Sequence, residues 1–267
     1  MNTRKIKSDV VVVKVGTSTL TYQTSKLNLK RLDILSRVIS DLKNSGKKVV
    51  LVSSGAIGVG MSKLGMSERP KSIKEKQAVA AVGQCELMSI YDRLFAEYGT
   101  IVAQILLTKD VLVNKERNEN VVNTFDTLLG KGIIPIVNEN DSISVDEIKF
   151  GDNDTLSAIV ANLVKADTLI ILSDIDGLYD KNPREHKDAI IISTVNKIDE
   201  NIENMASGAG TKVGTGGMIT KINAAKMATE NNIDVIIANG NDPHIIYDIL
   251  DGEEIGTIFL GERNKNQ

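Results

Sequence analysis

Short runs of β-branched and aliphatic residues, separated by longer stretches with helical spacing, constrain the fold of this chain most strongly. Six such runs recur along the chain, at Val10–Val15, Lys48–Val52, Ile101–Leu106, Ile133–Val137, Thr168–Leu172 and Asp234–Ile237. Apolar runs of this length are typical of strands buried on both faces. Their alternation with helical stretches predicts an α/β fold, a three-layer α/β/α sandwich around a mostly parallel central sheet.

The stretches between the runs carry apolar stripes at helical spacing, from Leu29 to Leu42, from Ala78 to Leu94 and from Leu156 to Val164. The chain has four prolines and no shift in composition, so we expect residues 1–267 to form a single domain. The segment from Ile143 to Phe150 alternates poorly, and we interpret it as a small hairpin that leaves the core. Ligands of such sheets bind beyond the carboxyl ends of the strands, where we expect the site residues.

Composition disfavours several classes of protein. The 267 residues include no Trp and carry a net charge of −3, which argues against a nucleic-acid-binding surface. Cys85 is the sole cysteine, so an intramolecular disulfide and a cysteine-based zinc site are excluded; we interpret it as a helix-packing residue. The sequence shows neither a signal peptide nor an apolar stretch of membrane-spanning length. We therefore expect a cytoplasmic protein without membrane or nucleic-acid partners.

Several common catalytic motifs are missing. The sequence contains no G-x-x-x-x-G-K-[ST], no complete G-x-G-x-x-G, no H-E-x-x-H and no G-x-S-x-G. A P-loop enzyme, a Rossmann dehydrogenase and a Ser/His/Asp hydrolase are disfavoured accordingly.

The motifs that are present are turns of small or polar residues directly after the strand-like runs. Lys14 ends the first run, where an ammonium group is costly unless it meets an anion, and Gly16 lets a phosphate approach the backbone. A lysine that snorkels from an edge strand explains Lys14 equally well. Ser54 and Gly55 follow the second run and open a helix whose N–H groups suit an anion, although a serine N-cap accounts for the same pattern.

Two further clusters combine several polar side chains. The segment from Asn138 to Asp141 has four of them, more than a turn requires. It predicts a donor-and-acceptor site for a zwitterion, with Asp141 facing an ammonium group. The segment from Gly151 to Asp154 precedes an apolar helix. A helix cap at Asp152 or Asn153 explains part of this pattern. Asp154 lies in the first turn, where a carboxylate interacts favourably with the helix dipole, and a buried carboxylate there would also hold two lysines in position.

The last two turns suit a nucleotide. Ser173 and Asp174 follow the fifth run, and five glycines between residues 208 and 217 precede a helix with Thr220 and Lys221. Such a glycine-rich loop suits a mobile cover over phosphates. A disordered surface loop is the alternative, which a lysine of buried character directly after the loop disfavours.

In this order, from about residue 10 to 260, these segments resemble the amino acid kinase family. The matching segments are V-V-K-V-G-T-S, V-S-S-G-A-I, K-Q-A-V-A-A-V-G-Q, V-N-E-N-D, G-D-N-D-T-L-S-A, S-D-I-D-G-L-Y and G-T-G-G-M-I-T-K. The resemblance implies the fold of that family. It also implies that Lys14 contacts the transferred phosphoryl group, that Lys221 acts on the nucleotide side and that Asp154 orients both lysines.

The resemblance further implies two binding sets. The amino-acid set is Ser54, Gly55, Asp141 and Asn153. The nucleotide set is Lys14, Ser173, Asp174, Thr215, Gly216, Gly217, Met218, Ile219, Thr220 and Lys221. Mg²⁺ would bridge the phosphates of ATP, and no metal-contacting residue is named.

The implied reaction is the ATP-dependent phosphorylation of the γ-carboxylate of L-glutamate to γ-glutamyl phosphate, the first step of proline biosynthesis. A carboxylate is ionised at neutral pH and needs no general base. The resemblance also implies feedback inhibition by proline and homo-oligomerisation. Some relatives carry a further C-terminal PUA domain, and we expect the short form without it. The alternatives are a kinase of aspartate or N-acetylglutamate, and a sensor of amino acids or nucleotides without catalysis.

Overall fold

The computed structural model describes residues 4–22, 24, 26–143, 153–183, 185–208 and 217–262. Eight strands form one sheet in the order β3-β4-β2-β1-β5-β7-β8-β6, and all neighbours pair in parallel except the antiparallel pair of β7 and β8. The strands are β1 Val10–Val15, β2 Lys48–Ser53, β3 Val102–Leu107, β4 Ile134–Glu139, β5 Thr168–Ser173, β6 Thr194–Val195, β7 Asp234–Asn239 and β8 Thr257–Phe259.

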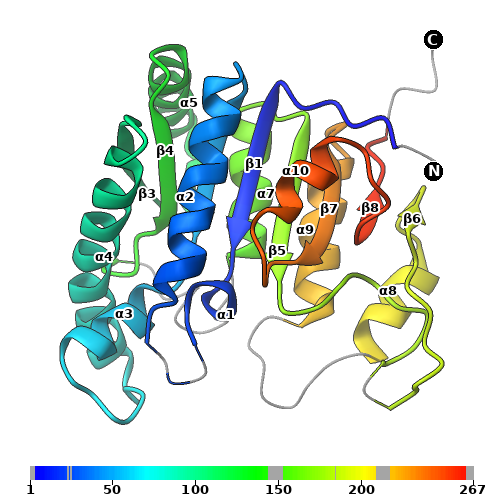
Figure 1. The fold of residues 1–267 in the computed structure, drawn as a ribbon, viewed down its shortest axis with the longest axis horizontal. Helices are drawn as coiled ribbons and strands as arrows, with labels where there is room; N and C mark the ends of the chain where they lie inside the picture. The colour runs from blue at the N-terminus through cyan, green and yellow to red at the C-terminus, as the bar shows by residue number, and fades with distance from the viewer. Residues whose placement is uncertain are drawn as a thin grey trace.

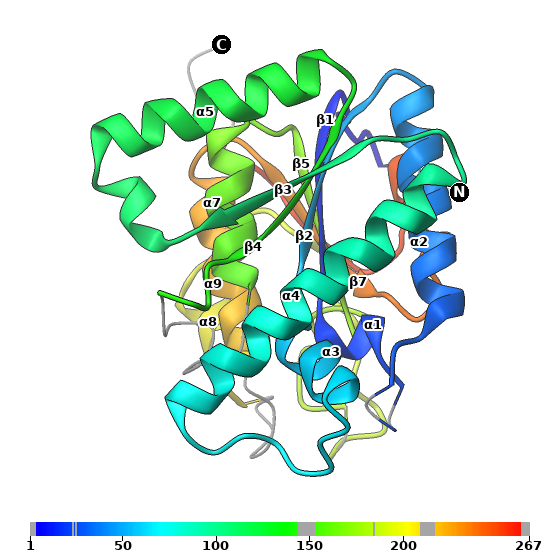
Figure 2. The ribbon, with the colours of Figure 1, turned by 90° about the vertical axis from the view of Figure 1, so that its left-hand side faces the viewer.

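Helices cover both faces of the sheet (Figures 1 and 2). One layer contains α1 Thr17–Leu20, α2 Leu29–Asn44, α3 Ala56–Lys63, α4 Ile73–Ala96 and α10 Ile245–Leu250. The other contains α5 Lys115–Gly130, which follows the 3₁₀ turn η1 Lys109–Leu112, together with α7 Asp154–Leu163, α8 Glu200–Gly208 and α9 Met218–Thr229. No helix within the described residues combines the length and the apolar character that a membrane span requires.

The two core clusters follow from the pleat of the strands. Val11, Val13 and Val15 of β1 pack under the α2 layer, whereas Val12 packs under the α7 layer. Successive side chains of a strand point to opposite faces, so a strand covered on both sides is apolar at nearly every position. The predicted α/β sandwich with a mostly parallel sheet is thereby confirmed.

Differences from the expected elements are small and have physical reasons. All six predicted strands are present, and five of them end one or two residues later than their apolar runs. Four of these five end at a polar residue, such as Ser53 or Glu139, and β3 ends at Leu107. The strands β6 and β8, which have two and three residues, are too short to produce a pattern. The predicted hairpin from Ile143 to Phe150 lies outside the described residues apart from Ile143.

Helices α3 and α4 cross in backbone contact, which places the middle of α4 beside the sheet edge. A Cβ atom on Gly83 would lie 1.7 Å from the carbonyl oxygen of Ala56, and one on Gly60 would lie 2.0 Å from that of Val79. Only glycine permits so close an approach. Cys85, two residues after Gly83, is exposed. The expectation that it packs in the helix interface is wrong, because α4 buries Gly83 and Leu87 and turns the position between them outward.

Candidate functional site

The carboxyl ends of the parallel strands bring the predicted segments together. Lys14 of β1 lies in register with Val52 of β2 and with Ile171 of β5, and Val52 lies in register with Val137 of β4. Residues that follow these strands therefore meet at one edge of the sheet, beside α1 and α3 at the bottom of Figure 1. The N-terminus of α7 reaches the same edge, since Asn153 donates to the carbonyl oxygen of Ser53 over 3.2 Å.

The centre of this edge is a buried cluster of charges formed by Lys14, Asp154 and Lys221. The Nζ of Lys14 lies 2.5 Å from Oδ1 of Asp154, and the Nζ of Lys221 lies 3.0 Å from Oδ2. Asp154 is fully buried and each lysine is 4% exposed. The three side chains sum to one positive charge, and buried charges are tolerated when they are paired or meet a ligand of opposite sign.

Asp154 is held by its helix as well as by the lysines. It is the first residue of α7, where a carboxylate interacts favourably with the helix dipole. The hydroxyl of Thr220 lies 3.0 Å from Oδ2 of the same carboxylate and 2.8 Å from the carbonyl oxygen of Gly217. Both carboxylate oxygens are thus engaged, which fixes the direction of the two ammonium groups.

A chain of side-chain amides lies next to this cluster. The Nδ2 of Asn153 donates to Oδ1 of Asn138 over 2.7 Å, and the Nδ2 of Asn138 donates to Oε1 of Gln84 over 2.8 Å. The backbone N–H of Glu139 donates to the same Oδ1 of Asn138 over 2.9 Å. Asn153 is fully buried, and its Oδ1 has no hydrogen-bond partner among the described residues. A buried acceptor without a partner is costly unless a ligand supplies a donor.

Asp141 provides a second buried acceptor. It is 7% exposed, and its Oδ1 has no hydrogen-bond partner among the described residues. Burial, followed by the charge of Glu139, raises the pKa of Asp141 from 3.8 to about 7. An ammonium group bound beside it would reverse both effects, because an opposite charge favours the ionised carboxylate.

The turn after β2 contains two residues, Ser54 and Gly55, that are predicted to bind the amino acid. Ser54 is buried, and Gly55 precedes α3 with φ of 101°, a left-handed conformation that favours glycine. The hydroxyl groups of Ser53 and Tyr91 lie 2.9 Å apart. Burial raises the pKa of Tyr91, which holds this phenol in its neutral form.

The residues predicted for the nucleotide lie across the cluster from the amides. The Ser173 hydroxyl donates to Oδ1 of Asp174 over 3.2 Å. Gly217 precedes α9, which begins with the buried Met218; Ile219 is 38% exposed. Thr215 and Gly216 lie outside the described residues.

Comparisons with known proteins agree with this geometry. A scan against protein families matches residues 9–239 to the family described as "Amino acid kinase family". The chain belongs to the amino acid kinase family. It is 62% identical to a glutamate 5-kinase of Clostridium perfringens over 96% of each chain. It is 53% identical to a glutamate 5-kinase of Listeria monocytogenes, over 96% of this chain and 94% of the relative.

A solved structure shares the fold of this amino acid kinase. The UMP kinase from Bacillus anthracis matches with a TM-score of 0.62 and 17% identity, over 96% of this chain and 97% of the other. At this identity the likeness concerns the fold alone.

The sequence did not single out every residue that this amino acid kinase places at the edge. Gln84 and Tyr91 come from α4, far along the chain from the strands whose ends they touch. Gln84 ends the segment K-Q-A-V-A-A-V-G-Q, which resembles the family without suggesting a role, and Tyr91 lies outside every matching segment. Glu139 lies in the segment V-N-E-N-D, but its effect on Asp141 depends on the distance between the two carboxylates.

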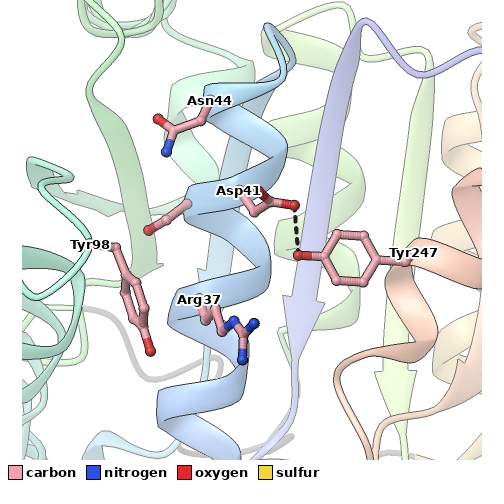
Figure 3. Close-up of a pocket in the computed structure, with 6 residues that line it drawn as sticks. Arg37, Asp41, Asn44, Tyr98 and Tyr247 are labelled. Carbon is pink, nitrogen blue, oxygen red and sulfur yellow. Dashed lines mark hydrogen bonds between the residues drawn. The ribbon is translucent and has the colours of Figure 1, made fainter.

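A separate pocket of about 260 Å³ lies on the outer face of α2, away from the charged cluster (Figure 3). Its polar groups come from α2, from α10 and from the turn after α4, and they are Arg37, Ser40, Asp41, Asn44, Tyr98 and Tyr247. The Tyr247 hydroxyl donates to Asp41 over 2.9 Å. Burial, together with this bond, raises the pKa of Tyr247 to about 12. None of the predicted site residues lines this pocket.

Proposed function

We propose that this amino acid kinase transfers the γ-phosphoryl group of ATP to the γ-carboxylate of L-glutamate and forms γ-glutamyl phosphate, the first step of proline biosynthesis. The observation that carries the proposal is the buried pair of lysines that share Asp154. Phosphoryl transfer asks the protein mainly to position groups and to stabilise negative charge. Two ammonium groups with fixed directions meet that requirement.

The chemical step needs no proton transfer from the protein. An oxygen of the γ-carboxylate attacks the γ-phosphorus, an O–P bond forms, and the bond from that phosphorus to the β-bridging oxygen breaks. The electron pair of this bond leaves with ADP. Lys14 is proposed to face the transferred group and Lys221 the nucleotide phosphates, so that charge is neutralised on both sides of the moving phosphorus.

Glutamate as the acceptor is supported by two observations. Relatives at 53–62% identity are named glutamate 5-kinase. The edge also presents two buried oxygens without partners among the described residues, from Asp141 and Asn153, and these suit an α-ammonium group. We propose that Ser54 and Gly55 bind a carboxylate of the same substrate.

Mg²⁺ is proposed to enter with the phosphates of ATP. Within the described residues, no group of three or more His, Cys, Asp or Glu side chains is placed to hold a metal ion, so these residues form no protein cage for Mg²⁺. Mg²⁺ commonly keeps several waters and binds through substrate phosphates. No protein ligand is therefore assigned to it.

An ADP-release assay with Mg·ATP and, in turn, glutamate, aspartate and N-acetylglutamate tests the proposal. Glutamate should give the highest kcat/KM, and N-acetylglutamate should be poor because it lacks a free ammonium group for Asp141. Preference for another acid would point to a different amino acid kinase. Nucleotide binding without turnover on any acid would point to a sensor.

Three further properties belong to the proposal through the family resemblance. These are feedback inhibition by proline, assembly into a homo-oligomer and a cytoplasmic location. Inhibition assays with proline and the mass of the protein in solution test the first two.

A further inference from the structure

We propose that Gln84 is a positioning residue for recognition of the substrate's ammonium group, and that it acts through Asn138 on Asn153. The inference rests on the proposed function for the identity of the substrate. Gln84 itself lies on α4 and is half-buried. Its Oε1 ends the amide chain that begins at Asn153, and the described structure shows no bond from Gln84 to any other site residue.

The position of Gln84 is set by helix packing. The preceding residue, Gly83, is in backbone contact with Ala56, the first residue of α3. The two helices lie side by side next to the strand ends in Figure 2. Gln84 is therefore placed by a rigid contact and not by a loop, and a site held by packed elements keeps its geometry closely.

The hydrogen-bond directions along the chain decide which atom Asn153 offers. Asn138 is 1% exposed, and its Nδ2 donates to Gln84 while its Oδ1 accepts from Asn153. The Nδ2 of Asn153 also donates to the carbonyl oxygen of Ser53. Both N–H groups of this amide are therefore engaged. The oxygen of Asn153 is the atom available to a ligand, and as an acceptor it suits an ammonium group.

Loss of the acceptor on Gln84 should loosen this arrangement. The Nδ2 of Asn138 would then be buried with one partner fewer, which costs free energy until the amide turns toward another acceptor. A turned Asn138 no longer holds Asn153, whose amide group could then direct its N–H groups at the ammonium. The substrate would lose an acceptor, while the lysine cluster around Asp154 would be unchanged.

Steady-state kinetics of Gln84→Met and Gln84→Glu test the inference. The methionine side chain of Gln84→Met has a similar length but lacks the acceptor. The side chain of Gln84→Glu keeps an oxygen at the position of Oε1. For Gln84→Met we expect the KM for glutamate to rise about tenfold, equivalent to about 1.4 kcal/mol, with kcat and the KM for ATP within twofold. Gln84→Glu should stay within threefold of wild type. Gln104→Met, on the exposed face of β3, is the control and should change nothing.

Glutarate, which has both carboxylates of glutamate but no ammonium group, distinguishes recognition from general damage. Wild type should prefer glutamate to glutarate, and Gln84→Met should reduce that preference about tenfold. An unchanged preference, or a loss of kcat on both acids together, would overturn the inference. If Gln84→Met does not fold, as judged by circular dichroism, Gln84→Ala replaces it.

The two proposals fail in different measurements. If wild type prefers another amino acid, the proposed function fails, and the same comparison is made with that acid and its counterpart without the ammonium group. If wild type uses glutamate but Gln84→Met keeps the wild-type KM and preference, the inference about Gln84 fails alone.

Discussion

Replacing Asp141 by Asn should stabilise the protein and weaken substrate binding, and both effects should depend on pH. Asp141 is buried beside Glu139, and its pKa lies at about 7 in place of 3.8. A carboxyl group with a raised folded pKa contributes stability that is complete below its unfolded pKa and is lost as the pH rises through the folded value. In this protein the loss runs from about pH 4 to pH 7.

The magnitude follows from the two pKa values. A change of one pKa unit corresponds to 1.36 kcal/mol, so moving from 3.8 to about 7 makes the wild type about 4 kcal/mol less stable above pH 7 than below pH 4. Asparagine does not ionise and avoids this loss. The substitution also has an effect on stability that does not depend on pH. Beyond that effect, linkage predicts that the free energy of unfolding of Asp141→Asn exceeds that of wild type by about 2 kcal/mol at pH 5 and by about 4 kcal/mol at pH 8.

Urea denaturation of the substrate-free protein at pH 5 and pH 8 measures this difference. Asp126→Asn, which removes an exposed carboxylate from α5, is the matched control and should differ little between the two pH values. The glutamate KM of wild type should fall as the pH rises through about 7, whereas that of Asp141→Asn should be higher and flat. Equal stabilisation at both pH values, or unaltered glutamate binding, would refute the reasoning.

The remaining predictions concern the lysine cluster and the helix contact. Lys14→Ala should lower kcat at least a hundredfold, with a much smaller effect on glutamate binding. Lys30→Ala, on the exposed face of α2, is the control and should leave kcat unchanged. An unaltered kcat in Lys14→Ala would remove that residue from phosphoryl transfer. Asp154→Asn should lose about 3–5 kcal/mol of stability, because two buried ammonium groups lose their shared carboxylate; a loss below 1 kcal/mol in thermal unfolding would contradict the buried geometry. Gly83→Ala should lower the free energy of unfolding by about 1–3 kcal/mol through overpacking against Ala56. At Gly130 an added Cβ meets nothing within 4 Å, so Gly130→Ala should be neutral or slightly stabilising. Equal stability of these two variants would disprove the tight crossing of α3 and α4.

Much of the fold could be predicted from the sequence because its signals are local. A strand buried on both faces is apolar along most of its length, as β1 and β5 are, and polar residues such as Lys14 and Ser173 mark the point where it ends. Parallel pairing then places those ends along one edge. For these reasons the segments around Lys14, Asn138 and Ser173 could be expected near one another before any coordinates were known.

The sequence could not supply the relations between distant residues. Lys14 and Asp154 are 140 positions apart, and Asp154 and Lys221 are 67 apart; their distances depend on how α7 and α9 pack on the sheet. The raised pKa of Asp141 depends on burial and on Glu139, which no periodicity reveals. The roles assigned to these residues remain predictions, and the experiments above decide them.

What the sequence determined by itself was therefore the class of fold, the strand ends and the family, since each is written in contiguous residues. The tertiary structure alone decided that one carboxylate serves two lysines and that Gln84 of α4 reaches the amide of Asn138 at the end of β4. Charge pairing and hydrogen bonding act over a few ångströms, and only packing brings residues far apart in the chain within that range.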